Sequence, residues 1–462
     1  MEAKINKILS LNMLSTFIVQ GVNFITIPLF SRLLGTTQYG IYSLFASWVS
    51  IFTCAIGFSM VSAIGPGMYT FKNEYREFRN SILCCTTLIS IVQVVFVVLF
   101  RNFIGAIIDF PPVIVCLIIL SSLGHYLMMF VQNVLTYEKR ALENLILSVG
   151  YSILSVLASL ILIFLSDRNE RYIGRIHAVT LSYLFFGILF STFLIKEKPM
   201  GINKKYCSFG FKVSYPIIFH SLALNILIQS DRVMMNYYRI EPTIIGIYSL
   251  FYSFCSILSV IVTALNNSWT PFYFDYIDEK KWSVLKEKSR NYIHFFSIIC
   301  FGFIMLSREV SYIIGDSSYR GGINIIPVLA LGIYFTFIYQ FIINYEFFYK
   351  KTKIISFGTV FASVLNVILN AILIPLWGMY GAAIATALSY FTLFLAHYII
   401  ITHMKEYRYH LKWKVFIPGI IGMLVGTILF YALSSWWYIR WGLGIALGCL
   451  ELYRIYKRKS IF

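Results

Sequence analysis

"GIYSLF" at residues 40–45 is spelled again at residues 246–251, 206 positions further along the chain (246 − 40). The residues that follow the two copies also resemble each other at this offset: Ser47 and Ser253, Trp48 and Phe254, Ser50 and Ser256, Ile51 and Ile257. Similarity that extends beyond the shared hexapeptide indicates an internal duplication. The sequence therefore predicts two structurally related halves.

The composition indicates whether these halves fold in water or in a membrane. Hydrophobic residues make up 59% of the 462 residues, charged residues make up 13%, and the mean hydropathy is +0.76. A soluble protein is roughly half apolar and about a quarter charged. The sequence therefore predicts an integral membrane protein.

Apolar runs that are long enough to cross a bilayer, about 17 to 25 residues, recur along the whole chain. We place 14 predicted spans at residues 11–30, 41–63, 81–100, 113–135, 145–166, 173–195, 213–236, 246–268, 291–307, 323–345, 354–375, 381–402, 415–433 and 437–453. The first run lacks a small-residue cleavage site, so we expect a retained helix rather than a signal peptide. The predicted fold class is an all-α polytopic membrane protein.

The basic residues predict the orientation, because short loops rich in Lys and Arg stay in the cytoplasm. With the N-terminus inside, the inner segments hold about 28 basic residues and the outer segments about 9, and residues 167–175 form the one contrary loop. An even number of spans then places both termini in the cytoplasm. The net charge of +18 is explained by this topology and gives no sign of a nucleic-acid partner.

The repeat and the topology together predict the organisation of the chain. Both copies of GIYSLF open spans that run inward, six spans apart, which is typical of parallel repeats and alternating access in transporters. The predicted parts are an N-terminal lobe, a cytoplasmic linker, a C-terminal lobe and a segment with two further helices and a basic tail: residues 1–195, 196–212, 213–402 and 403–462.

Polar side chains are costly in a bilayer and usually face a bundle interior or a wet cavity. In the span at 213–236 they fall within an arc of about 80°, which includes Asn225 and Gln229, and the first span carries Gln20 and Asn23 in the same way. We expect these two stripes to face a solvated cavity. For the serine rows of the two GIYSLF spans we expect hydrogen bonds between helices.

Charge inside the spans points to the cargo. Asp231 and Arg232 form the clearest intramembrane ionisable pair, with Arg232 on the polar stripe and Asp231 on the same side as His220. A local pair at the outer interface, with Arg232 snorkelling, is the alternative. Arg32 is likewise either an interfacial anchor or a cationic contact for a ligand.

The remaining ionisable groups give weaker indications of function. We expect Glu346 and Glu451 to reach cytoplasmic water, because both lie near span ends. Arg175 and His177 are the alternative source of positive charge if Arg32 and Arg232 are only anchors. The Cys and His spacing predicts no metal site, no cofactor motif is present, and no outer loop carries catalytic groups, so we expect a protein that is not an enzyme.

Three stretches of the sequence carry a family resemblance. They are FSRLLGTTQYGIYSLF at 30–45, SDRVMMNYYRIEPTIIGIYSLF at 230–251 and GMYGAAIATALSYF at 378–391. The chain resembles the Wzx-type polysaccharide flippases, which move O-antigen or capsule repeat units and belong to the superfamily of the lipid II flippases and the multidrug and toxin extruders. The resemblance implies two MATE-like lobes of six helices each, with two additional C-terminal helices.

The resemblance also implies a cargo and partners. The cargo would be an undecaprenyl-diphosphate-linked oligosaccharide, with its diphosphate held by Arg32 and Arg232 and its sugars contacted by Asn225, Gln229, Gln20 and Asn23. Asp231 and His220 would orient or couple, and the polysaccharide polymerase and the chain-length machinery would be partners beside the lipid bilayer. The alternatives are a multidrug extruder of the same superfamily and a membrane-embedded glycan polymerase.

Overall fold

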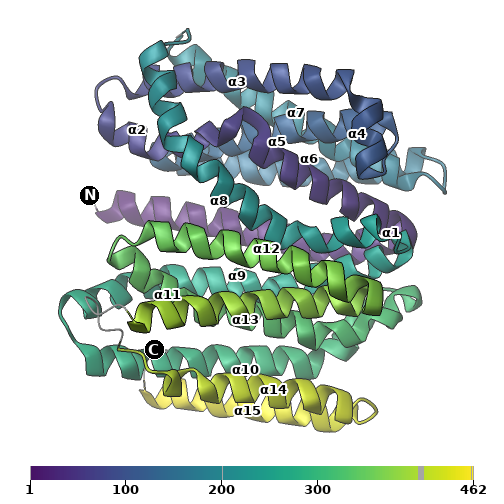
Figure 1. Ribbon diagram of the computed structural model, residues 1–462, viewed down its shortest axis with the longest axis vertical. Coiled ribbons are helices and arrows are strands. Elements are labelled where there is room, and N and C mark those ends of the chain that lie inside the picture. The colour runs from purple at the N-terminus through teal and green to yellow at the C-terminus, as the bar shows by residue number, and fades with distance from the viewer. Residues whose placement is uncertain (1, 200, 404–409, 459, 461–462) are drawn as a thin grey trace. The chain divides into compact units, whose positions relative to one another are not determined.

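The computed structural model describes residues 2–199, 201–403, 410–458 and 460, and for residues 2–10, 12 and 13 it describes the backbone alone (Figure 1). Within these residues every regular element is a helix. The contacts divide the chain into two compact units, Met1–Gly246 and Ile247–Phe462. The predicted lobes, residues 1–195 and 213–402, have other bounds than these units, and the division into two six-span lobes stays a prediction.

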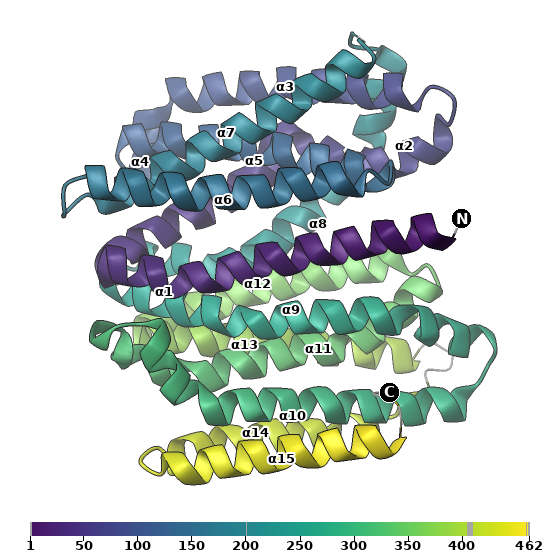
Figure 2. The ribbon, with the colours of Figure 1, turned by 180° about the vertical axis from the view of Figure 1, so that it is seen from behind.

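The first unit contains the first eight α-helices and one 3₁₀ segment. In chain order they are α1 (Glu2–Ala55), η1 (Ile56–Ala63), α2 (Ile64–Thr70), α3 (Tyr75–Leu99), α4 (Arg101–Ile108), α5 (Pro112–Tyr137), α6 (Ala141–Leu165), α7 (Arg171–Glu197) and α8 (Lys204–Tyr237). Helix α7 packs on α5 and α6, and α8 packs on α1 and η1. Figure 2, which shows the ribbon from behind, shows α6 and α7 side by side.

The second unit begins within α9 (Pro242–Asp278). Its other elements are α10 (Trp282–Ile314), η2 (Ser317–Ile325), α11 (Ile326–Phe348), α12 (Thr352–Trp377), α13 (Met379–His403), η3 (Trp413–Val415), α14 (Ile417–Ala432) and α15 (Trp437–Arg458). Helix α13 packs against both α11 and α12, while α10 packs against α14 and α15 (Figures 1 and 2).

The predicted spans all fall on helices, and the all-α polytopic fold class is confirmed. The first two spans occupy α1 and η1, and each of the other twelve occupies a helix of its own. Among the described residues, eleven helical segments are long and apolar enough to cross a membrane, and one of them, Leu14–Thr70, holds the first two spans. The last two predicted spans fall outside this group, because α14 is shorter and α15 carries several charged residues.

Helix α1 consists of two arms that meet at Gly35. This residue has φ 67° and ψ 174°, a backbone conformation that is essentially restricted to glycine. The bend lies inside the predicted signature FSRLLGTTQYG and separates the first predicted span from the second. The glycine therefore lets one long helical segment present both of its arms to the same interior.

The predicted span at 41–63 is not one continuous α-helix. Residues Gly57, Phe58 and Ser59 all have positive φ, which interrupts the helical hydrogen bonds. The Gln93 side chain repairs the break, because its Oε1 accepts from Gly57 N at 3.0 Å and its Nε2 donates to the Ala55 carbonyl at 3.1 Å. Within a bilayer such a break is tolerated only where side chains replace the lost backbone partners.

The two copies of GIYSLF begin at a close crossing of backbones inside the first unit. A Cβ atom on Gly40 would lie 1.9 Å from the Pro242 carbonyl oxygen, and one on Gly246 would lie 2.0 Å from the Thr36 carbonyl oxygen. The offset of 206 relates Gly40 to Gly246 and Thr36 to Pro242. It also relates Thr37 to Thr243, whose side chains form a hydrogen bond. Such reciprocal contacts are what a local two-fold relation requires, which supports the inferred duplication.

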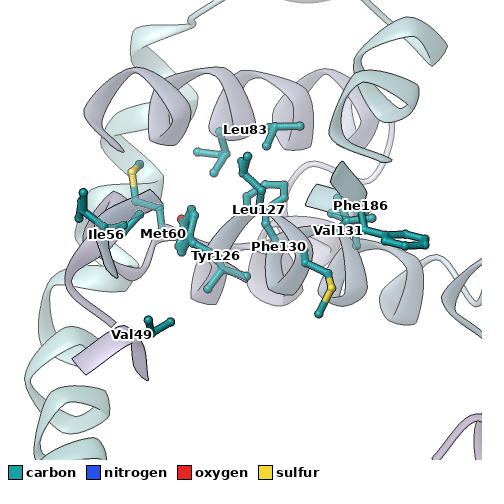
Figure 3. Close-up of a cluster of buried hydrophobic side chains, with 14 of the residues drawn as sticks. Val49, Ile56, Met60, Leu83, Tyr126, Leu127, Phe130, Val131 and Phe186 are labelled. Atoms are coloured by element: carbon teal, nitrogen blue, oxygen red, sulfur yellow. The ribbon is translucent and has the colours of Figure 1, made fainter. Parts of the chain in front are cut away.

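A cluster of buried apolar side chains forms the core of the first unit (Figure 3). The members labelled in Figure 3 come from the end of α1, η1, α3, α5 and α7: Val49, Ile56, Met60, Leu83, Tyr126, Leu127, Phe130, Val131 and Phe186. In lipid this cluster is held by close packing rather than by exclusion of water. It fixes α5, from which several cavity residues project.

Candidate functional site in the first unit

The first unit contains an open polar cavity of about 850 Å³, which lies between both arms of α1 and helices α5, α6 and α7. This volume is within the range of about 300–1,000 Å³ that small-molecule sites occupy. Hydroxyl and amide groups from several helices line it, among them Gln20, Asn23, Gln132, Ser148, Ser152 and Ser155. A polar interior of this kind, inside an apolar helical bundle, is a candidate binding site.

The serines of α6 line the cavity because of their spacing. Ser148, Ser152, Ser155 and Ser159 follow one another at intervals of four, three and four residues, which places them on one face of a helix. The Ser148 hydroxyl also accepts a hydrogen bond from Gln132 Nε2 of α5 at 3.1 Å. This face offers a ladder of hydroxyl groups to a polar ligand.

Three stacked aromatic side chains line the cavity. The Tyr151 and Tyr183 rings lie 4.6 Å apart with an interplanar angle of 15°, and the His125 ring lies 4.7 Å from Tyr183 at 29°. All three residues line the cavity. They add an aromatic part to the wall that also holds the serine ladder.

Arg175 of α7 places a positive charge at this cavity. Its guanidinium carbon lies 3.4 Å from the centroid of the Phe30 ring and 4.3 Å from that of Tyr42, so the two arms of α1 hold it by cation–π contacts. Its Nε and Nη1 atoms are buried and have no hydrogen-bond partner among the described residues. No Asp or Glu is among the residues that line the cavity, all of which the structure describes.

An arginine with unsatisfied donors indicates an anionic ligand. Burial of a charge is costly unless hydrogen bonds or an opposite charge compensate it. The guanidinium has five N–H donors in a planar fork, which suits bidentate contacts with phosphate or carboxylate. The arrangement can therefore accept an anionic group next to a surface of hydroxyls, amides and aromatic rings.

The predicted residues of the first span lie in this cavity. Gln20 and Asn23 both line it, which confirms that the polar stripe of this span faces a cavity. Asn225 and Gln229 of α8 instead face the second arm of α1: the Ser50 hydroxyl donates to Asn225 Oδ1 at 2.6 Å, and the Ser47 hydroxyl donates to Gln229 Oε1 at 3.0 Å.

These two bonds confirm that serines of the first GIYSLF span hydrogen-bond between helices. Ser50 also lines the cavity, so Asn225 lies one hydrogen bond away from it. The roles of Asn225 and Gln229, like those of Gln20 and Asn23, in binding a substrate stay predictions.

The predicted charged residues do not line this cavity. Arg32 is exposed, three residues before the bend of α1, and Arg232 is buried, with its Nη1 donating to Gln229 Oε1 at 3.3 Å. Asp231 is fully buried, and the half-buried His220 has a buried Nδ1 without a hydrogen-bond partner among the described residues. These positions do not test the predicted roles, which are diphosphate binding by the two arginines and orientation or coupling by Asp231 and His220.

Sequence reasoning treated Arg175 only as an alternative and missed the serine ladder and the ring stack. The sequence did contain a signal for Arg175 and for the serine ladder. The loop at 167–175 is the one that opposes the charge rule, and the serines from 148 to 159 follow helical spacing in an otherwise apolar span. Tyr151 and Tyr183 gave no signal, because aromatic residues are frequent throughout this chain.

A second polar feature of the first unit is a network of ion pairs at the ends of α3, α5, α6 and α7. Arg79 is fully buried and pairs with both Glu138 and Glu197. Arg140 contacts Glu138 at 3.3 Å and Glu197 at 2.7 Å, and it also pairs with Glu143. Burial lowers the pKa of Arg140, but its hydrogen bonds and ion pairs with Glu143 and Glu197 outweigh burial and raise that pKa above its ordinary value.

The expectation that Glu346 and Glu451 reach water was wrong. Their side chains are only 1% and 6% exposed in the second unit. Each contacts an imidazole, because neighbouring helices bring His397 and His294 to them. Proximity to the end of a span did not imply exposure, since helix packing covers these positions.

Comparison with solved structures identifies the class to which this fold belongs. The chain is similar to the lipid II flippase MurJ in an inward closed conformation, with a TM-score of 0.73 and 18% identity over 97% of this chain and 99% of that chain. It is also similar to an inward-facing multidrug resistance MATE family transporter of the MOP superfamily, with a TM-score of 0.61 and 13% identity over 91% of this chain and 98% of that chain. The fold is that of multi-span membrane transporters.

The sequence comparisons then identify the family. The profile of the family described as polysaccharide biosynthesis protein matches residues 6–276, and the chain belongs to this family. A membrane protein of Haemophilus influenzae is 24% identical over 364 residues, which cover 74% of this chain and 84% of that relative.

Proposed function

We propose that this protein is a flippase, which moves an undecaprenyl-diphosphate-linked oligosaccharide repeat unit from the cytoplasmic to the outer leaflet of a bacterial inner membrane. The product would serve the synthesis of a surface polysaccharide such as O-antigen, capsule or exopolysaccharide. The family and the transporter fold support movement of a lipid-linked precursor of polysaccharides. A polysaccharide polymerase and its chain-length machinery would then act on the repeat units outside.

The observation that carries this proposal is Arg175 in the polar cavity. Its unpartnered donors suit a diphosphate, and the serine ladder and the amides offer the many hydrogen bonds that sugar hydroxyls need. Tyr151 and Tyr183, which line the cavity, suit contacts with the C–H groups of sugars. Arg32 and Arg232 remain in the proposal as further cationic contacts, and Asp231 with His220 as orienting or coupling groups.

The same cavity disfavours the export of cationic drugs. A cation would meet the positive charge of Arg175 and would find no carboxylate among the described residues that line the cavity. The proposal therefore predicts that loss of this protein leaves the susceptibility of cells to cationic drugs unchanged.

Deletion of the gene in its own host tests the function. We expect surface polysaccharide to disappear and undecaprenyl-diphosphate-linked repeat units to accumulate, and both effects to be reversed by the wild-type chain but not by an Arg175→Gln chain. Normal surface polysaccharide in the deletion strain, with altered drug susceptibility, would refute the proposal.

The direction of transport rests on the predicted orientation. Residues 72–79 and 280–288 are two basic segments that the charge rule places in the cytoplasm. Cysteines introduced at exposed positions within them, such as Asn73 or Lys280, should resist an impermeant thiol reagent in intact cells. Labelling from outside would reverse the orientation and the proposed direction.

A further inference from the structure

A buried pair of ionisable groups lies in the second unit, away from the cavity described above. Glu346 of α11 and His397 of α13 are 1% and 0% exposed. His397 Nδ1 lies 2.8 Å from one carboxylate oxygen of Glu346 and 2.9 Å from the other. Ionisable residues inside membrane helices are rare, and a functional role is the default hypothesis for them.

The other nitrogen of the imidazole is enclosed by α12. His397 Nε2 is buried and has no hydrogen-bond partner among the residues that the structure describes. It faces Gly358, where a Cβ atom would lie only 1.9 Å from Nε2. Because the glycine has no side chain, α12 can close over the ring and separate it from water.

The charge balance of the pair depends on one proton. A neutral imidazole that donates from Nδ1 to an ionised carboxylate leaves a net negative charge in the interior. One additional proton makes the pair neutral overall, either as imidazolium with carboxylate or as neutral imidazole with carboxylic acid. An uncompensated buried charge is strongly unfavourable, so enclosure by the helices favours the form of the pair that carries this proton.

Three other titratable groups lie near the pair. The ring of Tyr339, also on α11, lies 5.0 Å from the imidazole and is neutral when protonated. Lys351, at the start of α12, is half-buried, and its backbone N–H donates to the Glu346 carbonyl oxygen at 2.8 Å. Tyr398, which follows His397, packs against Phe394 and Trp413.

We propose that Glu346 and His397 form a proton-binding site of the second unit, which releases and takes up one proton only when α11, α12 and α13 separate enough to admit water. Proton exchange is thereby linked to the opening of these helices. The site is independent of the cargo proposed above, since it lies outside the cavity and involves none of its residues.

Infrared difference spectroscopy of the full chain in lipid nanodiscs tests the site. Between about pH 5 and pH 8, the range in which histidine titrates, we expect carboxyl and imidazole bands whose protons exchange slowly with deuterium. These bands should be lost in both Glu346→Gln and His397→Gln. A slowly exchanging signal that survives in both variants would overturn the proposal.

The second unit offers a matched control pair. His294 Nδ1 lies 3.1 Å from the Glu451 carboxylate, but the His294 side chain is 45% exposed. The Glu451→Gln variant should therefore lose only rapidly exchanging signals. Gly358→Ala should shift the slow imidazole band, whereas Gly302→Ala, where a Cβ would meet no atom within 4 Å, should not.

Vesicle transport tests the link between the proton and helix opening. With geranyl diphosphate as the probe, an imposed pH gradient should change the transport rate of the wild type and of Glu451→Gln but not that of Glu346→Gln. An equal response of all three would overturn the link. If the wild type moved no lipid diphosphate, the cargo proposal would fail, while the infrared titration would still decide the proton site.

Discussion

Arg175→Gln removes the one cation whose donors are unpartnered in the polar cavity while it keeps a similar side-chain length. A hydrogen bond to a charged group contributes about 1.5–3 kcal/mol, so its loss should weaken diphosphate binding roughly 10- to 150-fold. Arg175→Lys should fall between the wild type and Arg175→Gln, because an ammonium keeps the charge but lacks the bidentate fork. Stability should change little, since the variant loses cation–π contacts but also a poorly solvated charge.

Thermal unfolding with geranyl diphosphate measures this effect. At a ligand concentration of about 100 Kd for the wild type, binding stabilises the folded state by about 2.7 kcal/mol, and the same concentration should stabilise Arg175→Gln by only about 0.3–1.4 kcal/mol. Arg171→Gln is the matched control, because Arg171 lies one turn earlier on α7 and does not line the cavity. Equal stabilisation of Arg175→Gln and the wild type would refute the assignment of Arg175 to the ligand.

Three further perturbations test other parts of the argument. In an Arg32→Ala, Arg232→Ala double variant we expect loss of surface polysaccharide at unchanged protein abundance, and normal export would leave both arginines as anchors. Gly40→Ala should destabilise the fold by about 1–3 kcal/mol in thermal unfolding, because its Cβ would meet a backbone carbonyl at 1.9 Å; Gly21→Ala, where a Cβ meets nothing within 4 Å, should not. Arg79→Gln should cost about 3–5 kcal/mol, since two glutamates lose their buried partner, and an unchanged melting temperature would show that the network is not required for stability.

Much of the fold could be predicted from the sequence because the relevant signals are local. Hydropathy over about 20 residues identifies a span wherever it lies in the chain, and all predicted spans fall on helices. The offset of 206 between the two copies of GIYSLF likewise required only the comparison of two segments. The structure shows that Gly40 and Gly246 meet at a backbone crossing, while their equivalence in two superposable lobes stays a prediction.

The candidate site was only partly predictable. The spacing of polar residues placed Gln20 and Asn23 toward a cavity, because helical periodicity shows which residues share a face. Periodicity does not show which neighbour that face meets. Thus Asn225 and Gln229, which share a stripe in the same way, bond to serines of α1 instead.

The tertiary structure alone decided which groups come together across the sequence. Arg175 meets Phe30 and Tyr42 because the bend at Gly35 turns both arms of α1 toward α7. Glu346 meets His397, 51 residues away, because α11 and α13 pack side by side. Hydropathy and periodicity describe each helix by itself, whereas the burial of a charge and the identity of its partner depend on how the helices pack.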